Sequence, residues 1–145
     1  MKMRRFPTAA ACMAILAFAP ANAEQMQRFG DWEVHYIVLP SGFLKPDVAA
    51  GYGLVRGRDR AFINVSVLDP ENRPATATIR GDITNLLGQR QELTFREIAE
   101  GGGVYYLGDI KHSNEEVLRF KIRITPPGES EMLLEFQQKL YWEEP

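Results

Sequence analysis

The chain has 145 residues, with 17 lysines and arginines against 19 aspartates and glutamates, and a net charge of −2. This length fits one domain with a sizeable core. The mildly acidic balance gives no electrostatic reason to expect nucleic acid or an anionic membrane surface as the partner.

The N-terminus has the three-part layout of a secretory signal. Lys2, Arg4 and Arg5 precede an apolar run over residues 9–18, and the small residues of Ala21-Asn22-Ala23 follow. This pattern predicts a cleavable signal peptide over residues 1–23, with the mature chain starting at Glu24. The apolar run is about half of the roughly 20 residues that a retained membrane anchor needs.

Removal of the signal peptide changes the composition of the protein. The mature domain, residues 24–145, has 122 residues, 14 basic and 19 acidic, for a net charge of −5. The only cysteine, Cys12, leaves with the signal, so no internal disulfide can form in an oxidising compartment. We expect a periplasmic protein with no membrane span after cleavage.

The mature chain alternates apolar and polar residues in short runs separated by turn residues. The clearest case places Leu118, Phe120, Ile122 and Ile124 on one face of a strand. The predicted strands cover residues 31–39, 61–68, 75–85, 89–98, 104–110, 118–124 and 132–142.

This spacing of strands predicts an all-β fold. We expect a single immunoglobulin-like or fibronectin-like β-sandwich of about seven antiparallel strands over residues 24–145. A closed barrel is the alternative, because alternation shows which residues face inward but not how the sheets close.

Residues 40–59 form the longest stretch without a strand pattern, and such loops are often functional. Pro46 and Asp47 suit the start of one short helix, which Gly51 and Gly53 would end. Aromatic, apolar and basic residues in and just after this crossover have the composition of a recognition surface. The candidate binding residues are Phe43, Leu44, Tyr52, Arg56, Arg58 and Arg60. The alternative is that the apolar members plug one end of the sandwich and the arginines are ordinary strand-edge charges.

No motif indicates catalysis, so we expect a protein that is not an enzyme and has no cofactor. The only histidines, His35 and His112, do not lie beside a serine in a glycine-flanked elbow, and no residues have the close spacing of a zinc site. A metal site would need the fold to bring both histidines together. Copper with Met26 or Met132 as a soft ligand is the form to test.

Several short strings resemble domain-of-unknown-function family 4426, whose members are short exported proteins of Gram-negative bacteria. The strings include Phe43-Leu44-Lys45-Pro46-Asp47-Val48-Ala49, Thr84-Asn85-Leu86-Leu87-Gly88-Gln89 and Leu93-Thr94-Phe95-Arg96-Glu97. The resemblance covers nearly the whole mature chain and implies an exported single domain, but no reaction, ligand or catalytic residue.

The expected function is therefore a periplasmic, non-catalytic binding or accessory domain. Its partner would be a periplasmic protein, a peptide or a small anionic ligand, bound by the crossover or by the edge of the final strand. The alternatives are a metal-binding or metal-trafficking protein that uses His35 and His112, or an uncharacterised enzyme.

Overall fold

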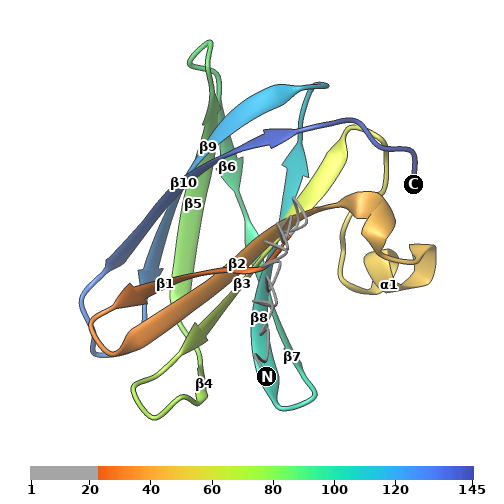
Figure 1. The fold of residues 1–145 in the computed structure, drawn as a ribbon. Helices are drawn as coiled ribbons and strands as arrows, with labels where there is room; N and C mark the ends of the chain where they lie inside the picture. The colour runs from red at the N-terminus through yellow and green to blue at the C-terminus, as the bar shows by residue number, and fades with distance from the viewer. Residues whose placement is uncertain (1–22) are drawn as a thin grey trace, which may run out of the picture.

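The computed structural model describes residues 23–145 (Figure 1). The predicted signal peptide, residues 1–23, lies outside this range except for its last residue. The elements are β1 (Gln25–Phe29), β2 (Trp32–Pro40), η1 (Ser41–Phe43), α1 (Pro46–Gly51), β3 (Arg60–Leu68), β4 (Pro74–Ala75), β5 (Thr78–Asn85), β6 (Arg90–Leu93), β7 (Phe95–Glu100), β8 (Gly103–Lys111), β9 (Glu116–Thr125) and β10 (Met132–Leu140).

The strands form two separate antiparallel sheets. Sheet A has the order β1-β2-β3-β8-β7, with β4 also pairing with β3, and sheet B has the order β10-β9-β5-β6. The predicted sandwich of antiparallel strands is confirmed, and no single closed barrel forms in the described part of the chain. The finer immunoglobulin-like or fibronectin-like assignment stays a prediction.

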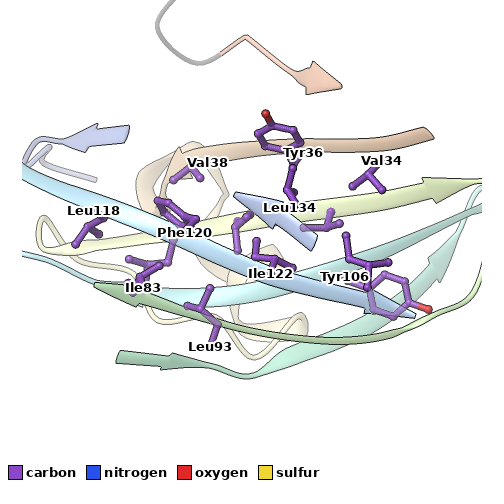
Figure 2. Close-up of a cluster of buried hydrophobic side chains, with 14 of the residues drawn as sticks. Val34, Tyr36, Val38, Ile83, Leu93, Tyr106, Leu118, Phe120, Ile122 and Leu134 are labelled. Carbon is purple, nitrogen blue, oxygen red and sulfur yellow. The ribbon is translucent and has the colours of Figure 1, made fainter. Parts of the chain in front are cut away.

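The alternation seen in the sequence determines the core. In β9, Leu118, Phe120, Ile122 and Ile124 are all buried, as the pattern predicts, while the residues between them face solvent. The ring of Phe120 stacks on Phe136 of β10 with centroids 4.4 Å apart. Figure 2 shows Phe120 and Ile122 of β9 in one buried cluster with Val34 and Tyr36 of sheet A, which fills the space between the sheets.

The strands differ from the prediction in that β1 is an additional strand and two predicted strands are each divided in two. The polar segment of β1 carries no apolar alternation, yet it pairs with β2 after a tight turn at Gly30, which has a φ of +62°. The predicted strand over 75–85 is divided into β4 and β5, and that over 89–98 into β6 in sheet B and β7 in sheet A. Leu93 and Phe95 both pack into the core on either side of this change of sheet, so their spacing alone indicated one continuous strand.

The crossover between β2 and β3 covers the outer face of sheet A instead of plugging an end of the sandwich. Its ends are tied together by Ser41, whose hydroxyl donates to the Gly57 carbonyl at 2.9 Å and accepts from the Gly57 amide at 3.0 Å. Ala49, Phe62 and Leu107 are buried but lie outside the cluster between the sheets. Figure 1 shows α1 on the side of sheet A away from sheet B.

The predicted short helix is present as α1, which begins at Pro46. Among the described residues, no helix has both the length and the apolar character that a membrane span requires.

Candidate functional site

The six candidate binding residues of the crossover differ in their exposure to solvent and in the residues that they contact. Phe43 is 67% exposed and Leu44 is half-buried. Tyr52 donates a hydrogen bond to Glu100 of β7 at 2.5 Å. The binding surface expected from these residues stays a prediction.

The three arginines also have different surroundings. Arg56 is half-buried, and its Nε has no hydrogen-bond partner within residues 23–145. The Arg58 guanidinium lies 4.3 Å from the centroid of the Trp142 ring, within the range of a cation–π contact. Arg60 begins β3 and acts electrostatically on Asp109, where burial raises the pKa of the carboxyl and the charge of Arg60 opposes that rise.

Trp142, which Arg58 contacts, lines a pocket at one end of the sandwich, between the two sheets. Figure 1 shows the connections β5–β6 and β8–β9 at this end. The pocket has a volume of about 370 Å³, and its floor is formed by the core residues Ile83 and Leu118. Its walls are Asp59, Asn85, Gln89, Arg90, Gln91, Lys111, His112, Ser113, Glu116 and Trp142. We refer to it as the end pocket.

Several polar side chains of the end pocket are held in place by the backbone. The Gln91 amide donates to the Lys111 carbonyl at 3.0 Å and accepts from the Lys111 amide at 3.1 Å, which joins β6 to β8 across the sandwich. The Asn85 amide donates to Gln89 at 2.7 Å and to Glu116 at 3.0 Å. These contacts leave the amide nitrogen of Gln89 without a partner among the described residues, so it can donate to a ligand.

His112 is the most buried titratable side chain of the pocket, with 6% of its surface exposed. Its Nδ1 lies 2.8 Å from the Ser113 carbonyl oxygen. Because a carbonyl can only accept, Nδ1 carries the proton, and Nε2 of the neutral ring is an acceptor. Nε2 makes no hydrogen bond to any residue in the range 23–145. No serine hydroxyl bonds to a histidine ring in that range either.

Trp142 closes the end pocket from the C-terminal side. Its indole Nε1 donates to the His112 carbonyl at 3.1 Å, and its backbone amide donates to the Asn114 side chain at 2.9 Å. The ring is 39% exposed. The C-terminal segment thus fixes an aromatic wall beside His112.

The structure separates the two histidines, so the predicted metal site that uses both of them is wrong. His35 lies opposite Ser66 of β3, whereas the His112 amide bonds to Asp59, seven residues earlier. At about 3.3 Å per residue along a strand, the two side chains are roughly 23 Å apart. One metal ion, bound at about 2 Å from each nitrogen, cannot join them.

His35 instead lies in a small polar cluster on the outer face of sheet A. Its Nδ1 is 2.8 Å from a Glu24 oxygen, and its Nε2 is 3.2 Å from a Glu33 oxygen. Met26 of β1 lies directly opposite His35 in the strand register. Residues 23–145 contain no group of three or more His, Cys, Asp or Glu side chains arranged to hold a metal ion.

The family assignment follows from sequence. A family model described as "Domain of unknown function (DUF4426)" matches residues 26–143. The chain belongs to this family. The resemblance inferred from the sequence is confirmed, and no activity comes with it. No curated protein matches the chain.

Solved structures agree with the fold. A DUF4426 family protein of Pseudomonas aeruginosa is 37% identical, with a TM-score of 0.77 over 83% of this chain and 97% of that one. FetP of uropathogenic Escherichia coli, recombinantly expressed in the periplasm of E. coli, is 15% identical, with a TM-score of 0.58 over 85% of this chain and 97% of that one. A copper-bound variant of FetP is 16% identical, with a TM-score of 0.57 over 86% and 94%. The FetP structures share only the fold with this chain.

Sequence reasoning missed most of the end pocket. Gln89, Gln91 and Trp142 come from segments that only the pairing of the strands brings together. Trp142 was predicted as the end of the last strand, although β10 ends at Leu140. The one available signal was a tryptophan in a polar C-terminal tail, and it gave no indication of its neighbours.

Proposed function

We propose that residues 24–145 form a periplasmic, non-catalytic domain that binds a small hydroxyl-rich molecule in the end pocket. The observation that carries this proposal is His112, a buried histidine that lines the pocket, with Nδ1 bonded to the backbone and Nε2 without a hydrogen-bond partner among residues 23–145. The leader pattern, and the fold shared with a protein expressed in the periplasm, support the compartment.

The lining of the end pocket suits such a molecule. A hydroxyl can donate to His112 Nε2 while another accepts from the Gln89 amide or from Lys111. The indole of Trp142 offers an apolar face, and a few polar groups around an apolar floor are typical of small-molecule sites. A carboxylate on the same molecule would be attracted by Lys111 and Arg90, which agrees with the small anionic ligand expected from the sequence.

The test uses Trp142 as the reporter. In a Trp32→Phe background, Trp142 is the only tryptophan of the mature chain, so its emission reports on the pocket. We expect members of a panel of neutral sugars, sugar acids and hydroxy acids to change this emission.

Two matched variants decide the role of His112. His112→Asn keeps an amide donor for the Ser113 carbonyl but removes the acceptor at Nε2, so it should weaken binding about tenfold, the worth of one hydrogen bond. His35→Asn should leave binding unchanged. Equal affinity in wild type and His112→Asn, or a panel that leaves Trp142 emission unchanged, would contradict the proposal.

Copper binding at His35 is the second candidate function. Directly opposite strand residues have Cβ atoms about 4.5–5.5 Å apart, so the Met26 thioether and the His35 imidazole can reach one ion. The Nδ1 to Glu24 distance of 2.8 Å equals the separation of two donors that bind one metal at about 2 Å and at a right angle. Thioether and imidazole together favour copper, the metal bound by the FetP variant.

Competition with a chromophoric Cu(I) chelator tests this candidate. Met26→Leu and His35→Asn should each weaken copper binding by tenfold or more, while His112→Asn should have no effect. Wild-type affinity in both Met26→Leu and His35→Asn would exclude the site. Because His112 and His35 serve different ligands, the same two histidine variants separate the two candidate functions.

A further inference from the structure

A second pocket lies on the outer face of sheet A, between the end of α1 and the strands β7 and β8. Its volume is about 280 Å³, and neither candidate function uses it. Its lining residues are Tyr52, Asn64, Ile98, Glu100, Tyr105 and Leu107. We refer to it as the tyrosine pocket. Two phenol rings and two aliphatic side chains give it apolar walls.

The tyrosine pocket contains two acceptor groups that a ligand could satisfy, Asn64 Oδ1 and the Glu100 carboxylate. Asn64 Oδ1 is buried and has no hydrogen-bond partner within residues 23–145. Glu100 accepts one hydrogen bond, from Tyr52, and forms no ion pair in the described part of the chain. An unpaired buried acceptor is unfavourable, so a ligand that supplies donors gains affinity by satisfying it.

Arg96, which is on the same strand as Glu100, does not fill this role. Arg96 lies opposite Leu107 in the pairing of β7 with β8, on the same face of the sheet. Its guanidinium packs against the backbone of Gly53, and the residue does not line the pocket. The carboxylate of Glu100 also raises the pKa of Tyr52 by accepting its hydroxyl hydrogen, which keeps the phenol neutral.

We propose that the tyrosine pocket binds an organic cation, a primary ammonium or guanidinium group such as the end of a basic side chain. Glu100 supplies the counter-charge and Asn64 Oδ1 a further acceptor. Tyr52 and Tyr105 supply aromatic faces, which attract cations. The cation provides several N–H donors, which can bond to Glu100 and to Asn64 Oδ1.

NMR titration of the ¹⁵N-labelled mature protein tests this proposal. The probes are n-butylammonium and N-acetyl-arginine methyl ester, each compared with a neutral analogue of similar shape, n-pentanol and N-acetyl-citrulline methyl ester. We expect the cations to shift the resonances of Asn64, Glu100 and Tyr105, and the neutral analogues to bind at least tenfold more weakly. The two cations distinguish ammonium from guanidinium as the preferred group.

A matched pair of variants on β7 identifies the counter-charge. Glu100→Gln should weaken cation binding tenfold or more, whereas Glu97→Gln should not. Glu97 is on the same strand but faces the other way, where it accepts from the buried Tyr106 at 2.6 Å. Equal binding of cation and neutral analogue, or wild-type affinity in Glu100→Gln, would overturn the proposal. In the Trp32→Phe background, Trp142 emission should stay constant in this titration, which would show that the cation does not bind in the end pocket.

Discussion

The inner and outer faces of sheet A are both buried at β3, but by different partners. Ile63 points toward sheet B and is fully buried in the main core. Its neighbour Phe62 points the other way and is 4% exposed, although it lies outside that core. The crossover supplies the cover on the outer side, where Ala49 and Leu107 are also buried.

The two faces of sheet A differ in how the segment that packs on each of them is held in place. Sheet B packs on the inner face and the crossover on the outer face. Sheet B is a four-stranded sheet with continuous backbone pairing. The crossover is a single segment, and its side-chain hydrogen bonds include the Ser41–Gly57 pair within it and the Tyr52–Glu100 bond to β7. Similar burial can therefore correspond to different resistance to change, because the cost of a cavity depends on how well its surroundings can move to fill it.

The largest effect is expected inside the sandwich. Ile63→Ala should lower the free energy of unfolding by about 3–4 kcal/mol, because two packed sheets cannot close the cavity. Urea denaturation followed by circular dichroism measures this loss. A loss below about 1 kcal/mol would show that the inner layer relaxes and that the contrast between the faces is absent.

Phe62→Ala should cost less than Ile63→Ala, about 2 kcal/mol, although it removes more atoms. A fully buried Phe→Ala change usually costs about 3–5 kcal/mol, and we expect the crossover to recover part of this by settling onto the sheet. The same urea experiment decides the order of the two variants. A larger loss at Phe62 than at Ile63 would mean that the crossover is as rigid as sheet B.

Gly53→Ala tests how closely the crossover approaches β7, with an expected loss of about 1–2 kcal/mol. Gly53 has a φ of +70°, and an added Cβ would lie within 3 Å of the Arg96 guanidinium. Gly51→Ala is the matched control, because an added Cβ there meets nothing within 4 Å and the residue ends α1. It should be neutral or stabilising by up to about 1 kcal/mol. Equal effects at both glycines would show that neither the positive φ of Gly53 nor its contact with Arg96 carries a cost.

The smallest effect concerns Asp109 on the outer face, and it depends on pH. Burial raises the pKa of this carboxyl above its unfolded value of about 3.9. The folded state therefore holds its proton to higher pH, and stability falls as pH rises through this window. Asp109→Asn removes the penalty, so it should stabilise the protein at pH 7 but not at pH 3. The same difference in urea midpoint at both pH values would argue against a buried charge.

Much of the fold was available from the sequence because alternation is a local property. Leu118, Phe120, Ile122 and Ile124 identify a strand and its inner face without knowledge of any neighbour. The division of residues 89–98 between two sheets was not available, since Leu93 and Phe95 keep the spacing of two that an uninterrupted strand would also have. The polar β1 was missed because pairing with β2, and not its own pattern, makes it a strand.

The candidate sites depended more on strand pairing than on local pattern. Tyr52 was identified from its place in the crossover, but its partner Glu100 is 48 residues away. His112 was identified only as one of two histidines, and its burial beside Trp142 follows from contacts between residues 30 positions apart. The metal site joining His35 to His112 was wrong because the strand pairing places His35 beside Ser66 and His112 beside Asp59.

The way the crossover is attached has a consequence for motion. A segment held over a completed sheet by few contacts can open as a unit while the sandwich stays folded. Amide hydrogens of residues 49–54 should then exchange with solvent far faster than those of β3 and β8. A cation bound between Tyr52 on the crossover and Asn64 on the sheet would stabilise the closed crossover and slow this local exchange. The degree of slowing would depend on the ligand concentration relative to the dissociation constant.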